Sequence, residues 1–223
     1  MPEDYFGRVA LENLGFLLEG YRLTILLTLA AIPASLIFGT LLGVLRIVPN
    51  KAVRSMATVY VEFFRNIPLL IVLFFVYHAL PRVNFTLSAF NSALVAIAIY
   101  TAAFVAEVVR AGIQSIHKGQ LEAARSLGLS YVQTMRFVIL PQAFAMIVPP
   151  LGNTYIAMLK NTSLASTIAV AELVYQGEVL DSRTFRTFEI FITVGILYLT
   201  LTLPLGALVN ALERRMVLKG RQP

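Results

Sequence analysis

The chain has 223 residues, of which 58% are hydrophobic and 13% are charged, and its mean hydropathy is +0.78. Soluble domains carry about 25% charged and about 45–50% apolar residues, so this composition excludes a cytoplasmic enzyme and indicates contact with membrane lipid. The absence of cysteine excludes disulfides and thiolate metal sites, and two histidines leave little for any other metal centre, so we expect none. The net charge of +6 is typical of Lys- and Arg-rich cytoplasmic loops, and we expect no nucleic-acid partner.

Long apolar stretches predict membrane-spanning helices, because a helix that crosses the roughly 30 Å hydrocarbon core needs about 20 apolar residues. The second stretch is long enough only if Glu62 and Arg65 lie at the membrane edge. Residues 1–21 are predicted to be an amphipathic or loop lead-in to the first span. We therefore predict an all-α, polytopic membrane protein with a single domain, 1–223, and spans at about 23–45, 57–80, 83–106, 150–171 and 189–212.

The fourth span allows two registers within the apolar segment 137–171, whose one charge is Lys160. Pro149 and Pro150 predict a helix break, because proline lacks the amide hydrogen and blocks the preceding turn. On that interpretation residues 137–148 approach the membrane and Lys160 falls near its middle. The alternative register, 137–159, places Lys160 at the far end of the span.

The distribution of Lys and Arg predicts the orientation. With the N-terminus outside, the inner segments 46–55, 107–136 and the tail after Leu212 contain eleven Lys and Arg residues, and the outer segments contain five. Because cytoplasmic loops carry the excess of these residues, we expect the N-terminus outside and the C-terminus in the cytoplasm.

The inner segment 107–136 is too long for a simple turn. Gln120–Leu127 consists of strong helix formers, Gly128 can supply a left-handed C-terminal cap, and Ser130 with Gln133 forms a capping box. These signals predict two short helices joined at a glycine corner, which would make a rigid knob suited to docking. The alternative is an ordinary loop between spans.

An ordered set of motifs resembles the permease subunits of ABC-type importers, in particular the polar amino-acid subfamily. Glu122-Ala123-Ala124, followed by Gly128 and Leu140-Pro141, resembles the EAA loop of that family, although Val138 replaces its isoleucine. The rest of the resemblance extends over nearly the whole chain and lies in Phe64-Arg65-Asn66-x-Pro68-Leu69-Leu70, Glu107-x-x-Arg110-Ala111-Gly112-Ile113-x-Ser115, Gly119-Gln120, Gly152-Asn153 and Lys160-Asn161-Thr162-Ser163-Leu164.

The resemblance implies a multi-pass subunit of the bacterial cytoplasmic (inner) membrane. It would form the translocation path with a second permease subunit, identical or sister, and receive its substrate from an extracytoplasmic amino-acid-binding protein. A dimer of ATP-binding subunits would hold the ATP and Mg²⁺, because this chain has no G-x-x-x-x-G-K-[ST] loop, and we expect neither a cofactor nor a catalytic residue here. The resemblance implies that coupling to the ATPase lies with Gly119, Gln120, Glu122, Ala123, Ala124, Arg125 and Gly128.

Polar residues inside spans are the candidates for the substrate path. Thr154 and Asn161 lie seven residues apart, so they share one helical face and can point into one cavity. Lys160 would bind either the carboxylate of the substrate or backbone carbonyls at a helix break. Because Thr154 and Asn161 are neutral, we expect a neutral polar or acidic amino acid. The full set of candidates for the path is Arg65, Asn153, Thr154, Lys160, Asn161 and Ser163.

Four further interpretations concern one ion pair, one glycine pattern and two competing functions. Glu62 and Arg65, three residues apart, form either a structural ion pair or part of a gate. Gly39-x-x-x-Gly43 predicts close helix packing. A self-contained secondary transporter or channel would show internal repeats with paired broken helices, and the first half of the chain has no second broken segment. An intramembrane enzyme would need a catalytic set that the spans lack.

Overall fold

The computed structural model describes residues 7–220, with side chains described up to residue 216, and its elements are helical throughout this range. The elements are α1 (Arg8–Glu12), α2 (Leu14–Leu45), α3 (Lys51–Asn66), α4 (Leu69–Phe74), the π-helix η1 (Phe75–Ala79), the 3₁₀-helix η2 (Leu80–Val83), α5 (Ala89–Gln114), α6 (Lys118–Ser126), α7 (Tyr131–Thr134), the π-helix η3 (Met135–Ile139), α8 (Leu140–Asn161), the 3₁₀-helix η4 (Thr162–Ile168), α9 (Leu173–Thr184) and α10 (Thr187–Gly220).

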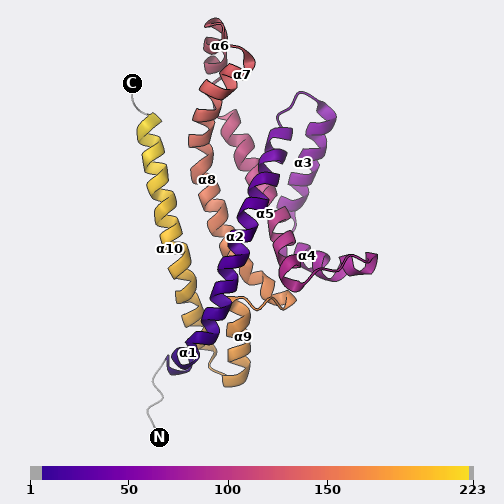
Figure 1. Ribbon diagram of the computed structural model, residues 1–223, viewed down its shortest axis with the longest axis vertical. Helices are drawn as coiled ribbons and strands as arrows, with labels where there is room; N and C mark the ends of the chain where they lie inside the picture. The colour runs from indigo at the N-terminus through magenta and orange to yellow at the C-terminus, as the bar shows by residue number, and fades with distance from the viewer. Residues whose placement is uncertain (1–6, 221–223) are drawn as a thin grey trace.

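The predicted all-α membrane architecture is confirmed. Four helical segments are long and apolar enough to cross a membrane: 14–45, 89–114, 131–168 and 187–216. The bent pair 51–66 and 69–83 makes a fifth if it is counted as one span. The α2–α3 turn, α6, α7 and the C-terminal end of α10 lie at one end of the molecule, whereas α1 and α9 lie at the other (Figure 1).

Helix α2 packs closely against α5, and the two glycines of the Gly39-x-x-x-Gly43 pattern make this possible. A Cβ atom on Gly39 would lie 2.7 Å from the carbonyl oxygen of Ala102, and one on Gly43 would lie 2.8 Å from that of Ala106. The prediction from the Gly39-x-x-x-Gly43 pattern is therefore confirmed: small residues let the two backbones approach. The main core, which includes Leu27 and Ile97, extends from this contact toward α4, α8 and η4.

The predicted second span, 57–80, is not one straight helix. The chain turns by 105° between α3 and the segment 69–83. The turn occurs at Ile67, whose backbone is extended (φ −110°, ψ 150°) because the ring of Pro68 disfavours the helical region for the preceding residue.

The predicted break at Pro149-Pro150 is wrong: both prolines lie inside the continuous helix α8. Membrane helices tolerate proline, because neighbouring helices and Ser or Thr side chains satisfy the freed backbone groups. The α-helix gives way to 3₁₀ geometry twelve residues later, at η4. There the hydroxyls of Thr162, Ser163 and Thr167 donate to carbonyl oxygens three residues earlier and compete with helical hydrogen bonds.

The other predicted bounds differ mainly in length. Helix α2 begins at Leu14, so part of the predicted lead-in 1–21 is helical, and residues 1–6 lie outside the described part. Helix α5 covers 89–114: it begins after the N-cap Ser88 and extends beyond the predicted span 83–106 through Glu107 and Arg110, which pair within the helix. Apolar content alone does not set the end of a helix whose charges are paired.

Candidate functional site

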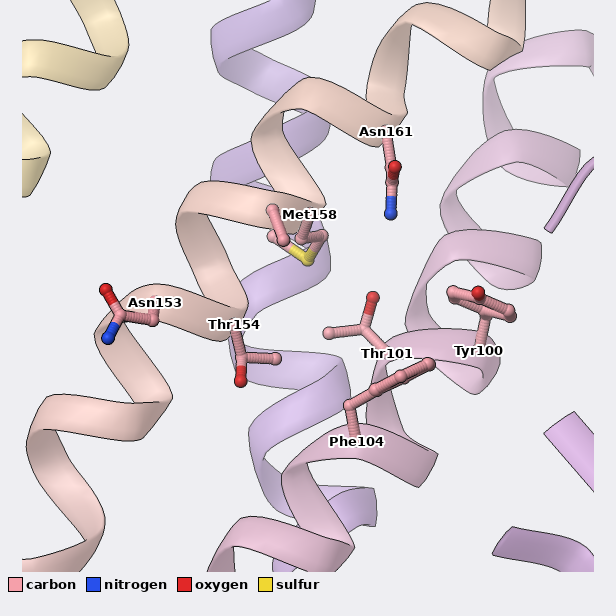
Figure 2. A pocket seen from close by; sticks show the side chains of 8 residues that line it. Tyr100, Thr101, Phe104, Asn153, Thr154, Met158 and Asn161 are labelled. Carbon is pink, nitrogen blue, oxygen red and sulfur yellow. The ribbon is translucent and has the colours of Figure 1, made fainter. Parts of the chain in front are cut away.

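A cavity of about 400 Å³ lies between α5 and α8 (Figure 2). We call it the seam cavity. The predicted pair Thr154 and Asn161 both line it, which confirms that they share a face and open onto one space. The remaining lining residues are Tyr100, Thr101 and Phe104 from α5 and Asn153, Ala157 and Met158 from α8.

The lining of the seam cavity is mainly apolar, and its polar groups are uncharged. Thr101 is buried, and the side chain of Thr154 donates to the carbonyl oxygen of Pro150 at 3.0 Å. The rings of Tyr100 and Phe104, one turn apart on α5, contact each other with centroids 5.1 Å apart. Amide, hydroxyl and aromatic groups can hydrogen-bond a polar solute and pack against its carbon chain, but they cannot neutralise a charge.

Other candidates from the sequence lie outside or at the edge of the seam cavity. Asn153 lines its rim, and its side chain points away from α5 (Figure 2). Lys160 is exposed, does not line the cavity and has no ion-pair partner in the described part of the chain. Ser163 lies in η4 and donates to the carbonyl oxygen of Lys160 at 2.8 Å.

Tyr100, Thr101 and Phe104 were missed by sequence reasoning. The four-residue spacing of the two aromatics in the third span is a visible signal that one face of α5 is distinct. This face is recognised as part of a cavity only from the packing of α5 against α8, which no local pattern predicts.

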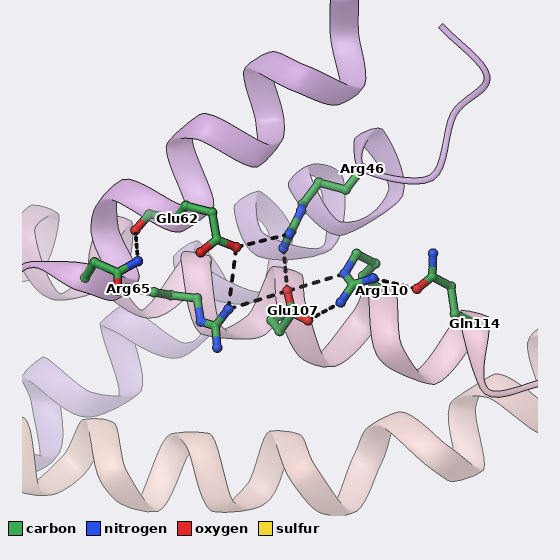
Figure 3. A network of polar contacts seen from close by, with 7 residues as sticks. Arg46, Glu62, Arg65, Glu107, Arg110 and Gln114 are labelled. Atoms are coloured by element: carbon green, nitrogen blue, oxygen red, sulfur yellow. Dashed lines mark hydrogen bonds and ion pairs between the residues drawn. The ribbon is translucent and has the colours of Figure 1, made fainter. Parts of the chain in front are cut away.

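Five charged residues meet where α3 and α5 lie beside the residue that follows α2 (Figure 3). We call them the arginine cluster: Arg46, Glu62, Arg65, Glu107 and Arg110. Arg46 follows α2 and is buried; its Nη1 atom donates to Glu107 and its Nη2 atom lies 3.4 Å from Glu62. Arg110 donates to Glu107 through two nitrogens and to Gln114 through a third contact.

The arginine cluster joins the predicted ion pair of Glu62 and Arg65 to a second pair on α5. Glu62 and Arg65 do pair, with 3.8 Å between Oε1 and Nη1, and Glu107 and Arg110 also pair. Arg46, which no local pattern singles out, connects them. The two interpretations of the Glu62–Arg65 pair, a gate or a structural ion pair, therefore apply to the whole arginine cluster.

The knob predicted within 107–136 is present. Its first helix, α6, begins one residue after His117, whose Nδ1 accepts from the backbone N–H of Gly119 at 3.1 Å. Gly128 has φ +77°, as a left-handed cap requires, and Ser130 forms the predicted capping box with Gln133. The N-cap role of His117 was not predicted.

Most side chains of the knob are exposed to solvent. Gln120, Glu122, Ala123 and Arg125 are exposed, whereas Ala124 is buried. Beside them three apolar side chains are 65–81% exposed: Leu127, Tyr131 and Val132. An exposed apolar group on a capped, locally rigid element is typical of a docking surface.

A fully buried carboxyl lies at the start of α9, toward the end of the molecule opposite the knob (Figure 1). Glu172, the N-cap of α9, is fully buried and accepts from the backbone N–H of Tyr175, the hydroxyl of Tyr198 at 3.0 Å and the hydroxyl of Thr24 at 3.4 Å. No ion pair to it is found in the part of the chain that the structure describes. Burial raises the pKa of the Glu172 carboxyl to about 7, and the hydrogen bonds from Tyr175 and Tyr198 oppose this.

Among the described residues, no group of three His, Cys, Asp or Glu side chains could hold a metal ion.

Comparison with known proteins identifies the family of this chain. Residues 31–218 match the family model described as "Binding-protein-dependent transport system inner membrane component". The chain is 42% identical over 208 residues to the probable glutamine ABC transporter permease protein GlnM of Bacillus subtilis (strain 168), covering 93% of this chain and 96% of that one. It is 39% identical over 202 residues to the glutamine transport system permease protein GlnP of Escherichia coli (strain K12), covering 90% and 92%.

A solved structure agrees with these relatives. The protein described as "Crystal structure of an amino acid ABC transporter with histidines" is 35% identical, superposes with a TM-score of 0.89 and is covered along its full length by 96% of this chain. The matched segment of the family model includes α5, α8 and the knob, which carry the seam cavity and the exposed apolar surface. The chain therefore belongs to the family of inner-membrane components of binding-protein-dependent transport systems.

Proposed function

We propose that this chain is the membrane-spanning permease subunit of an ATP-driven importer, and that its seam cavity conducts a neutral polar amino acid, glutamine first. The observation that carries the proposal is the lining of that cavity, which has hydrogen-bonding groups and no charge. Relatives that are 39–42% identical are described as glutamine permeases, which fits a lining suited to a side-chain amide.

Asn161 and Thr154 are proposed to bind the polar part of the substrate. The side chains of both line the cavity from α8, and Thr101 faces them from α5 (Figure 2). A cationic substrate side chain would have to leave water without a carboxylate to receive it, which costs several kcal/mol. Glutamine and other uncharged polar amino acids avoid this cost. Asn153 and Ser163 have a weaker claim because they lie at the rim and in η4.

The uptake test uses the importer reconstituted with its ATPase and binding protein in vesicles. In the wild type, glutamine should be taken up and arginine should compete poorly. Asn161→Asp adds the missing carboxylate and should improve competition by arginine by about tenfold, the effect of about 1.4 kcal/mol. Asn161→Leu is the control of similar size, and it should weaken glutamine uptake without helping arginine. Strong wild-type uptake of arginine would contradict the proposal.

The knob is proposed to couple this chain to a separate ATP-binding subunit dimer, which would hold the ATP and Mg²⁺. Gly119, Gln120, Glu122, Ala123, Arg125 and Gly128 would form or support the contact, with buried Ala124 anchoring α6. The contact would pass closure of the ATPases to the membrane helices as a rigid-body movement. A second permease subunit, identical or sister, would complete the path, and an extracytoplasmic binding protein would deliver the amino acid.

Gly128 offers a direct test of the coupling proposal. Its φ of +77° is costly for a β-branched residue but tolerable for asparagine. Gly128→Val should therefore reduce substrate-stimulated ATPase activity at least about tenfold or release the ATPase during purification, whereas Gly128→Asn should keep most of the activity. Full activity in Gly128→Val, or retention of transport by a chain purified without any ATPase, would contradict the proposal.

We also propose that the chain lies in the bacterial cytoplasmic membrane with its N-terminus outside and its C-terminus inside. The end that carries the knob and the α2–α3 turn would face the cytoplasm, and α9 would face outward (Figure 1). Single cysteines at Lys118 and Asp181 can test this with an impermeant thiol reagent, because the native chain has no cysteine. In intact spheroplasts, position 181 should label and position 118 should label only after lysis; the reverse pattern would overturn the orientation.

A further inference from the structure

The arginine cluster carries one more positive than negative charge. Three guanidinium groups face two carboxylates, and no ion pair to any other acidic side chain is found in the described residues (Figure 3). The side chain of Arg46 is only 7% exposed, and its Nε atom lacks a hydrogen-bond partner within the described chain. An uncompensated charge in such surroundings favours an additional anion.

Arg65 is the member whose pairing is incomplete. Arg46 and Arg110 both donate hydrogen bonds to Glu107. The Nη1 atom of Arg65, in contrast, lies 3.8 Å from Glu62 and 3.7 Å from Glu107, which is beyond hydrogen-bonding distance. Its side chain is 35% exposed. The guanidinium therefore keeps its planar donor edge available for a carboxylate.

Arg65 also lies between two spaces along the α5–α8 seam. Its guanidinium carbon is 5.9 Å from the centre of the Phe104 ring, which lines the seam cavity. Glu107, its ion-pair partner, lines a second hollow of about 300 Å³ nearer the knob, together with Gly112, Met146 and other residues of α5 and α8. Arg65 therefore contacts one lining residue of each space, Phe104 of the seam cavity and Glu107 of the second hollow.

We propose that Arg65 and its cluster form a second, transient binding station for the carboxylate of the transported amino acid, on the exit side of the seam cavity. The inference rests on the proposed function. The bidentate geometry of a guanidinium matches a carboxylate, and one carboxylate balances the charge of the cluster. The station binds the α-carboxylate, which every amino acid has, whereas the seam cavity discriminates between side chains.

The test separates a binding role from a structural one by charge. Arg65→Gln leaves two arginines with two carboxylates, a balanced cluster, so a purely structural role predicts unchanged or higher thermal stability and unchanged uptake. The station predicts that the maximum rate of glutamine uptake falls at least about tenfold, the effect of losing one charged hydrogen bond, with the half-saturating concentration and the thermal midpoint preserved. Arg65→Lys, which keeps the charge without the bidentate edge, should give a maximum uptake rate between those of the wild type and Arg65→Gln.

The measurement uses the complete importer in vesicles of phosphatidylcholine alone and in vesicles that also contain phosphatidylglycerol. Arg54→Gln, on the exposed surface of the same helix α3, is the matched control and should behave as the wild type. The station is overturned if Arg65→Gln transports normally, if it loses uptake together with thermal stability, or if its defect occurs only with the anionic lipid, which would mean that the anion is a lipid phosphate. Absence of uptake by the wild type would instead refute the proposed function, and the station with it.

Discussion

Two carboxylates in different parts of this molecule have contrasting surroundings. Glu107 is surrounded by the guanidinium groups of Arg46, Arg65 and Arg110. Glu172 is surrounded by the hydroxyls of Thr24 and Tyr198 and by backbone N–H groups. The first environment stabilises the ionised carboxylate, whereas the second favours the neutral acid. The carboxyl of Glu107 thus pairs with cations, whereas the carboxyl of Glu172 accepts hydrogen bonds from neutral groups.

The comparison predicts the largest effect at Glu107. Glu107→Gln leaves three guanidinium groups with one carboxylate, and breaking a pair of this kind costs about 2–4 kcal/mol. The thermal midpoint, followed by far-ultraviolet circular dichroism in detergent, should fall by about 5–10 °C. Glu62→Gln is the control, because the Glu62 side chain is half exposed and its loss should cost under about 1 kcal/mol. Equal effects of the two variants would show that burial of Glu107 does not matter.

Glu172→Gln should have a smaller effect that depends on pH. The pKa of Glu172 is raised from 4.5 to about 7 in the folded protein, so the folded state loses stability as the pH rises from about 4.5 through about 7. Glutamine cannot ionise and escapes this loss. Between about pH 5 and about pH 8, the difference in stability should shift in favour of the variant by up to about 3 kcal/mol.

The measurement for Glu172→Gln is the thermal midpoint of both proteins across this pH range, since the other ionisable groups are shared and cancel. A difference between the two proteins that stays constant with pH would mean that Glu172 is ionised throughout, and the contrast with Glu107 would be lost.

Tyr198→Phe should show the smallest effect. It removes one hydrogen bond to Glu172, worth about 1 kcal/mol, and leaves the ring in place. The loss should be greater at about pH 8 than at about pH 5, because a charged acceptor makes the stronger bond. Tyr21→Phe removes an exposed hydroxyl contact with Thr200 and is the matched control. If the loss in Tyr198→Phe is the same at both pH values, the hydroxyl acts on something other than the ionisable carboxyl.

The spans and the knob could be predicted because their signals are local. Apolar runs such as 89–106 identify a membrane helix without reference to neighbours, and the caps at Gly128 and Ser130 depend on backbone groups within a few residues. The shared face of Thr154 and Asn161 follows from helical periodicity alone. The prediction failed at Pro149-Pro150, where the local tendency of proline to break a helix was overridden.

The sites depend on residues that are remote in sequence. Arg46 and Glu107 are 61 positions apart, and Thr24 and Glu172 are 148 apart. No pattern along the chain indicates that such residues meet, because the packing of α2 against α5 and α9 decides it. Lys160 shows the converse: its single charge in an apolar stretch indicates a functional group, yet Lys160 does not line the seam cavity.

The sequence by itself determined that this chain crosses a membrane as helices, where the polar knob lies and which family it resembles, since hydropathy, capping and short motifs are read over a few turns. The tertiary structure decided which helices are neighbours, and with them the lining of the seam cavity, the unbalanced arginine cluster and the neutral surroundings of Glu172. The physical reason is that the energy of a charge in an apolar environment depends on which groups lie within a few ångströms in space, and sequence separation does not set that distance.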